Sequence, residues 1–290
     1  MRYRIASNVD AGDWRAAARL AIPARRLLSR RRIRRVAAAP TDEARDVEIR
    51  DWSAELLEAF DVRLQLTGLT HIEPRETYLV LSLHEGLLDV PLLLQLPIQM
   101  TFVARADLAS ERPVARLLEA SHQILINPES PSALRVVLRE ARRVSGQGRS
   151  TAMFPQGSVL GVETSFQQGA LVVARRLDLP VLPVVISGSH RIWEYPFSSL
   201  VRRHQPVNME ILAPRRIRAA GDYRDLEREM KRRAVENTWA PPRRYVPKRD
   251  GYWDGHRFDI DPDSAALADE ISRHRRAVSA ASMARDTRTA

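Results

Sequence analysis

The sequence predicts an α/β fold: a mostly parallel central sheet covered by helices, with a basic helical segment at the N-terminus. The main observation is that short apolar runs typical of buried strands alternate with longer stretches of helical periodicity across residues 77–187. The second is that residues 1–45 lack such runs and are rich in arginine. With 290 residues the chain can bury a large core, as one domain or as one domain with appendages.

The alternation begins after residues 51–60, which read as a helix that covers the core. Buried strands are then expected at 77–83, 99–104, 123–127, 150–154 and 181–187. Helices are expected near 86–96, 110–121, 130–145 and 167–178. Residues 207–212 predict a further strand at the sheet edge, and residues 224–237 a charged surface helix. Because strands that alternate with helices usually pair in parallel, the sheet is expected to be largely parallel.

The composition divides the chain into three regions. Residues 1–45 form the basic segment, residues 46–240 the α/β domain and residues 241–290 a C-terminal extension that opens with two prolines. No stretch approaches about 18 uninterrupted apolar residues, so we expect no transmembrane helix, and we expect no cleavable signal peptide. The chain has no cysteine, which excludes disulfides and thiolate metal ligands. Cytosolic residence is the default expectation.

The formal net charge of +10 is concentrated near the N-terminus. From Trp14 to Ala39 there are nine arginines and no acidic residue, and apolar residues are interleaved at roughly helical spacing. This composition is typical of a segment that lies on a membrane, where each basic residue contributes about 1 kcal/mol with anionic lipids. A basic helix packed on the protein core is the alternative. Nucleic acid would also suit the charge, but no DNA- or RNA-binding signature accompanies it.

Candidate catalytic residues follow the first predicted strand. The segment Leu81–Asp89 delivers His84 and, five positions later, Asp89. Strand ends that open into helices are where α/β folds place chemistry. A neutral histidine can remove a proton from a hydroxyl, and a carboxylate on its other ring nitrogen fixes the tautomer. His84 therefore reads as a general base and Asp89 as its orienting partner, with a structural histidine and a surface acid as the alternative.

Two later blocks support the catalytic interpretation. Phe154-Pro-Gln-Gly-Ser158 ends the fourth predicted strand, and Leu179-Pro-Val-Leu-Pro-Val-Val185 contains much of the next one. Gly157 permits close approach of the backbone, and neighbouring amides with the Ser158 hydroxyl suit a phosphate or a developing oxyanion. Upstream, Arg105 follows the second predicted strand, and its guanidinium suits a phosphate of the acceptor or of the donor.

Together these blocks resemble the glycerolipid acyltransferase family, over roughly residues 75–215. The resemblance implies transfer of a fatty acyl group from coenzyme A or an acyl carrier protein to a lysolipid hydroxyl, without a metal or redox cofactor. It also implies that residues 46–240 are the acyltransferase domain. The site residues that it implies are a catalytic pair, an acceptor-side motif and a basic position: His84 and Asp89; Gln156, Gly157 and Ser158; Arg105.

The chain departs from the family pattern at several positions. Leu83 precedes the histidine, where the family usually has asparagine. The family's Pro-Glu-Gly-Thr-Arg block reads Pro155-Gln-Gly-Ser-Val159, and Asn127-Pro128 stands where an acid and an arginine usually follow an apolar strand. Both arginines that would grip a glycerol phosphate are therefore missing. Either Arg105 or another arginine replaces them, or the acceptor lacks that phosphate, as a lyso-aminolipid or a glycolipid would.

The sequence thus predicts a peripheral membrane acyltransferase on the cytoplasmic side of the cell membrane. Its expected partners are a membrane surface with anionic lipids, a lysolipid acceptor, and acyl-coenzyme A or acyl carrier protein, but no nucleic acid. A non-catalytic lipid-binding member of the same fold is the main alternative. The chain has no Gly-x-Ser-x-Gly elbow, and Ser187-Gly-Ser-His190 lacks the context of one, which argues against a serine hydrolase.

Overall fold

The structure is a computed structural model that describes residues 30–106, 108, 112–157, 162, 164–192 and 203–237. Three predictions fall outside these residues: the first part of the basic segment, the C-terminal extension and the Ser158 hydroxyl. Among the described residues, no helix combines the length and the apolar character needed to cross a bilayer.

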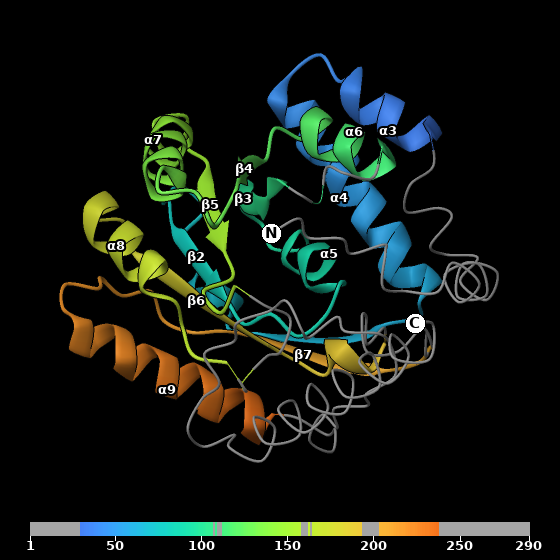
Figure 1. Ribbon diagram of the computed structural model, residues 1–290. Helices are drawn as coiled ribbons and strands as arrows, with labels where there is room; N and C mark the ends of the chain where they lie inside the picture. Colours follow the sequence, from blue (N-terminus) through green and yellow to red (C-terminus); the bar gives the residue numbers. More distant parts are fainter. Residues whose placement is uncertain are drawn as a thin grey trace, which may run out of the picture.

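In the described part, one sheet of seven strands is flanked by helices on both faces (Figure 1), which confirms the predicted α/β class. The strands are β1 (Arg63–Thr67), β2 (Leu79–Ser82), β3 (Met100–Arg105), β4 (Ile124–Ile126), β5 (Ser150–Met153), β6 (Val181–Ser187) and β7 (Pro206–Ile211). The helices are α3 (Arg30–Ala37), α4 (Asp42–Ala59), α5 (Asp89–Leu93), α6 (Arg112–Ala120), α7 (Ala133–Ser145), α8 (Gln168–Leu177) and α9 (Ala220–Glu236), with short 3₁₀ turns η1 (Leu69–His71) and η4 (Ser189–Arg191).

The strand order is β1-β7-β6-β2-β5-β3-β4. Strands β2 to β6 are joined by parallel pairings, whereas β7 is antiparallel to β6 and parallel to β1. The order switches beside β2, because β3, β4 and β5 lie on one side of it and β6 and β7 on the other. Open α/β sheets bind their ligands at such switch points, outside the carboxyl ends of the strands.

The structure corrects the predicted place of the strand at 207–212. This strand is β7, and it is not at the edge of the sheet because β1 pairs along its outer side. The sequence prediction contains no strand at 63–67, where only five residues alternate between exposed and half-buried positions. A segment this short has a weak signal in the sequence, and it forms a strand because β7 supplies its hydrogen-bonding partner.

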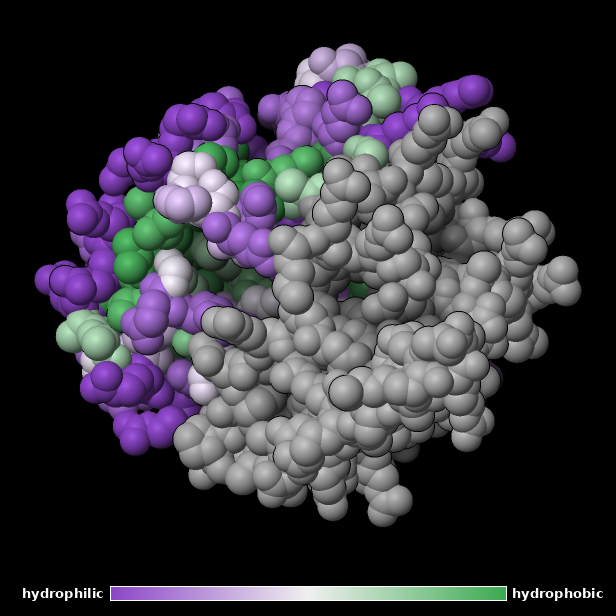
Figure 2. Space-filling view, in the orientation of Figure 1, coloured by the Kyte–Doolittle hydropathy of each residue, from purple (hydrophilic) through white to green (hydrophobic). Residues whose placement is uncertain are grey.

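Two apolar clusters cover the two faces of the sheet. Alternate residues of β2 point to opposite faces: Val80 joins the cluster beneath α4 and α5, while Leu79 and Leu81 join the one beneath α7, α8 and α9. On the outer sides of α7, α8 and α9, Figure 2 shows mostly hydrophilic residues. Burial on both faces explains why the central strands read as continuous apolar runs in the sequence.

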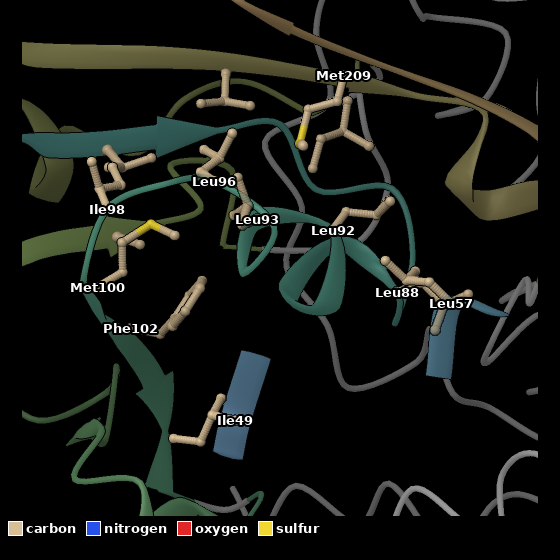
Figure 3. Packing of buried hydrophobic residues seen from close by; sticks show 14 of the residues in the cluster. Ile49, Leu57, Leu88, Leu92, Leu93, Leu96, Ile98, Met100, Phe102 and Met209 are labelled. Atoms are coloured by element: carbon tan, nitrogen blue, oxygen red, sulfur yellow. The ribbon is translucent and has the colours of Figure 1, made fainter. Parts of the chain in front are cut away.

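The short helix α5 is anchored deep in the first cluster. The apolar side chains in and around it share that cluster with residues of α4 and β3 (Figure 3): Leu88, Leu92, Leu93 and Leu96, with Ile49, Leu57 and Phe102. Burying a leucine contributes about 1.5–3 kcal/mol relative to exposing it, so the four leucines hold α5 firmly. Asp89, the first residue of α5, is thereby fixed in position.

The described end of the basic segment packs on protein. Ile33 and Val36 of α3 are buried, and Val36 belongs to the first apolar cluster. Arg32 pairs with Glu48 and Glu55 of α4. The apolar residues of α3 therefore contact protein rather than acyl chains, and the expected boundary after residue 45 falls inside α4. The membrane interpretation of residues 1–29 stays a prediction.

On the opposite face, Tyr223 connects α9 to the start of α8. Its hydroxyl donates a hydrogen bond to the Gln167 carbonyl, 3.0 Å away. Burial raises the pKa of the Tyr223 phenol above its ordinary value, so the hydroxyl stays protonated and available as a donor. This contact holds α8 against α9, close to the loop that follows β5.

We predict that Gly68→Ala strongly destabilises the protein by separating β1 from β7. Gly68 has φ +78°, and a Cβ there would lie 2.0 Å from the Ile211 carbonyl oxygen at the end of β7. The strain and the clash together should cost about 3 kcal/mol, measured as the free energy of unfolding in urea. The matched control is Gly221→Ala in α9, where a Cβ meets nothing within 4 Å. Equal stability of the two variants would contradict this packing of β1.

Candidate active site

Three loops meet at the carboxyl ends of three neighbouring strands. Because β6, β2 and β5 are adjacent in the sheet and parallel, the loops after them open on the same edge. These loops comprise residues 83–88 after β2, 154–157 after β5 and 188–190 after β6. The predicted residues His84, Asp89, Gln156 and Gly157 are thus gathered at one place.

The structure brings His84 and Asp89 into contact. The Nδ1 atom of His84 lies 2.7 Å from Oδ2 of Asp89. Asp89 is fully buried, whereas the His84 side chain keeps 19% of its surface exposed. An ionised carboxylate can only accept hydrogen bonds. Nδ1 of His84 therefore carries the proton and donates a hydrogen bond to Asp89. The lone pair of the His84 Nε2 atom is then left to accept a proton from another molecule.

The Asp89 carboxylate is surrounded by further donors. Its Oδ2 also accepts the backbone N–H groups of Glu85, at 2.6 Å, and Gly86, at 3.0 Å. Its Oδ1 accepts the hydroxyl of Ser189, from the loop after β6. Counting His84, four donors therefore converge on one buried carboxylate. These hydrogen bonds hold the carboxylate in one orientation, with Oδ2 directed at His84.

The ring of His84 is also held from the β5 side. It stacks on Phe154, with 3.9 Å between ring centroids and 18° between the ring planes. The hydrogen bond to Asp89 fixes the rotation of the imidazole, and the stacking fixes its plane. The histidine is thus held in one orientation before any ligand arrives.

A second histidine–carboxylate contact lies beside the first one. Oε2 of Glu85 accepts the backbone N–H of Gly188 at 2.8 Å and lies 3.0 Å from Nδ1 of His190. Both side chains are nearly buried, with 9% of Glu85 and 12% of His190 exposed. No motif in the sequence predicts a role for Glu85, Ser189 or His190. The sequence feature that could have indicated them is their position after a strand: Glu85 follows His84, and Ser189 and His190 come just after the apolar run of β6.

The described residues of the predicted acceptor-side motif, Gln156 and Gly157, lie in the tight turn after β5. Gln156 is 2% exposed, and Gly157 is exposed with φ +65°. The turn is closed by a hydrogen bond from the Gly157 N–H to the Phe154 carbonyl. The same loop that stacks Phe154 on His84 therefore carries the motif, as the sequence predicts.

Arg105 is the last residue of β3 rather than a residue of the loop after it. Thr151 of β5 pairs with both Leu79 of β2 and Thr101 of β3. His84 lies five residues beyond Leu79 and Arg105 four beyond Thr101, so the two are nearly level. Strand β5 lies between β2 and β3, so Arg105 and His84 lie at the same carboxyl edge of the sheet. Arg105 is half-buried at that position.

Comparisons with known proteins find similarity to acyltransferases. Residues 63–187 match a family model described as Acyltransferase. A 1-acyl-sn-glycerol-3-phosphate acyltransferase of Limnanthes alba is 26% identical over 159 residues, covering 53% of this chain and 55% of that protein. The 1-acyl-sn-glycerol-3-phosphate acyltransferase alpha of Mus musculus is 25% identical over 174 residues, covering 56% and 61%. The chain thus matches somewhat more than half the length of these relatives.

A solved structure shares the fold. The crystal structure of the 1-acyl-sn-glycerophosphate acyltransferase PlsC from Thermotoga maritima aligns with a TM-score of 0.57 and 22% sequence identity. The alignment covers 69% of this chain and 83% of that one. The likeness therefore includes most of the sheet and its helices, beyond the matched family segment.

We predict that Asp89→Ala destabilises the folded protein more than His84→Ala does. Removing the carboxylate leaves the Glu85 N–H, the Gly86 N–H and the Ser189 hydroxyl buried without their acceptor, which should cost about 3 kcal/mol. Removing the His84 imidazole, which is partly exposed and makes a single hydrogen bond to Asp89, should cost about 1 kcal/mol. Urea unfolding measures both, with the exposed Asp51→Ala in α4 as the control. An Asp89→Ala protein as stable as the wild type would contradict the arrangement of donors.

Proposed function

We propose that the protein transfers a fatty acyl group from a thioester to a lysolipid hydroxyl, from the premise that residues 63–187 match the Acyltransferase family model and resemble 1-acyl-sn-glycerol-3-phosphate acyltransferases. The observation that carries the proposal is the 2.7 Å contact between His84 Nδ1 and Asp89 Oδ2. A histidine so oriented, with its other nitrogen available, is the general base that attack by a hydroxyl requires.

In the proposed reaction, His84 Nε2 accepts the proton of the acceptor hydroxyl while the hydroxyl oxygen attacks the thioester carbonyl. The buried Asp89 carboxylate stabilises the imidazolium that forms. The tetrahedral intermediate carries a negative oxygen, for which the backbone amides of the turn after β5 are the proposed donors. Collapse of the intermediate breaks the carbon–sulfur bond, and the proton on His84 passes to the departing thiolate.

The proposed donor is acyl-coenzyme A or an acyl carrier protein, and both present the same thioester. The proposed reaction needs no metal or redox cofactor, because its steps are proton transfers and acyl transfer. A donor panel containing both thioesters distinguishes the two sources.

For the acceptor, we propose a lysophospholipid or related lysolipid, as in the named substrates of the 1-acyl-sn-glycerol-3-phosphate acyltransferases that it resembles. Pro128 and Val159 stand where the family's two phosphate-binding arginines are expected. The half-buried Arg105, at the same carboxyl edge of the sheet as His84, is our proposed replacement for binding a phosphate.

We also propose that the protein acts at the cytoplasmic surface of the cell membrane, where its lipid substrate lies. The support is the arginine-rich composition of the N-terminal segment. Flotation with anionic and with neutral liposomes tests this part separately. Binding to the anionic liposomes alone is the expected result. Equal binding to both kinds, or binding to neither kind, would contradict it.

We predict that His84→Ala lowers acyl transfer by about 10²–10⁴-fold, the range of general-base assistance. Asp89→Asn should also lower it strongly, because the amide no longer fixes the proton on Nδ1 of His84. The measurement is release of free thiol from palmitoyl-coenzyme A or an acyl carrier protein in the presence of a lysolipid panel. The chain has no cysteine, so it adds no thiol of its own.

The control for that experiment is His122→Ala, because His122 is exposed and lies in the turn after α6. It should retain wild-type activity. If wild type and His84→Ala were equally inactive over both donors and the whole lysolipid panel while liposome binding persisted, the lipid-binding alternative would replace this proposal.

We predict that Arg105→Ala raises the KM for lysophosphatidic acid about tenfold or more, since it removes a charge-assisted hydrogen bond to the phosphate. The KM for a lysolipid without phosphate should change little. Arg116→Ala, an exposed arginine of α6, is the control. An equal change for both acceptors would exclude Arg105 as the phosphate-binding residue, and activity confined to phosphate-free acceptors would show that the acceptor has no such phosphate.

A further inference from the structure

The two oxygens of the Asp89 carboxylate are held by different parts of the chain. Oδ2 accepts three groups from its own loop: Nδ1 of His84 and the backbone N–H groups of Glu85 and Gly86. Oδ1 accepts the hydroxyl of Ser189, which is 100 residues further along the chain. The Ser189 side chain therefore joins Asp89, and with it the loop after β2, to the loop after β6.

We infer that Ser189 is a positioning residue, whose hydroxyl fixes Oδ1 of Asp89 so that Oδ2 stays on His84. The terminal torsion of an aspartate is broad and roughly two-fold, so a carboxylate held at one oxygen can rotate away from an ideal orientation. A donor on the second oxygen removes that freedom. Because it concerns the proposed general base, this inference rests on the proposed acyl transfer.

Ser189 is itself braced by Glu85, which immediately follows His84. The Glu85 carboxylate binds the residues on both sides of Ser189, through the N–H of Gly188 and Nδ1 of His190. The two loops are also closely packed, because a Cβ on Gly86 would lie 3.3 Å from the Ser189 carbonyl group. Ser189 thus has little room to move, as a positioning role requires.

The neighbouring Ser187 offers a matched comparison. Both serines are 1% exposed, and they lie two residues apart at the end of β6. The Ser187 Oγ atom has no hydrogen-bond partner among the described residues. Ser187→Ala therefore removes a buried hydroxyl that orients nothing, whereas Ser189→Ala removes one that holds Asp89.

The first test needs no substrate. In protein labelled with ¹⁵N-histidine, the proton on Nδ1 of His84 should give a downfield resonance, assigned by its loss in His84→Gln. The adjacent His190, which contacts Glu85, is assigned in the same way with His190→Gln. We expect Ser189→Ala to shift or broaden the His84 resonance, Ser189→Thr to preserve it because the hydroxyl remains, and Ser187→Ala to leave it unchanged.

The second test is kinetic. Ser189→Ala should lower kcat roughly ten- to a hundredfold, the effect expected for one hydrogen bond to a charged group, with KM nearly unchanged. Ser189→Thr should restore most of the rate, and Ser187→Ala should match the wild type. Circular dichroism of each variant establishes that it is folded.

The outcomes separate this inference from the proposed function. If Ser189→Ala kept both the His84 resonance and the wild-type kcat, the positioning role would be wrong while acyl transfer stood. If the wild type showed no acyl transfer but Ser189→Ala still altered the His84 resonance, the positioning of Asp89 would stand and the proposed function would fail. A Ser187→Ala variant as impaired as Ser189→Ala would overturn the inference, because packing rather than the hydrogen bond would then be responsible.

Discussion

The site depends on one buried carboxylate whose two oxygens are both held by hydrogen bonds. Asp89 is fully buried, and an uncompensated buried charge costs several kcal/mol. Here it is compensated by two backbone N–H groups, the Ser189 hydroxyl and the His84 imidazole. Each of these contacts also fixes the group that makes it. The loop after β2, the loop after β6 and the His84 ring therefore have their positions set by the same requirement.

The packing of the fold makes this arrangement possible. The leucines around α5 fix the helix that begins with Asp89, and the order of the strands places β6 directly beside β2. Phe154, from the other neighbour β5, supplies the ring on which His84 stacks. The distances at the site are therefore a consequence of strand order and of helix packing beneath the sheet, and loops of the same sequence on another sheet order would not meet.

The residues at the expected motif positions differ from the family pattern. The family's acid and arginines are replaced by Gln156, Val159 and the Asn127-Pro128 pair. Beside His84 there is instead a nearly buried contact between Glu85 and His190. Under the proposed function, the residues for proton transfer, His84 and Asp89, match the family pattern. A phosphate on the acceptor would need a cation from another position, for which Arg105 is the proposed candidate.

The sequence by itself determined the elements whose signal is local. The apolar runs of β2 and β6 predict strands because both their faces are buried, and the order of residues brings His84 and Asp89 to a strand end. Only the tertiary structure decided which strands are neighbours. It placed β1 outside β7, and it brought Ser189 to Asp89 and His190 to Glu85 across about a hundred residues of chain. Local periodicity records which face of a strand is buried, but it contains no information about the partner, because pairing is decided by the packing of the whole sheet.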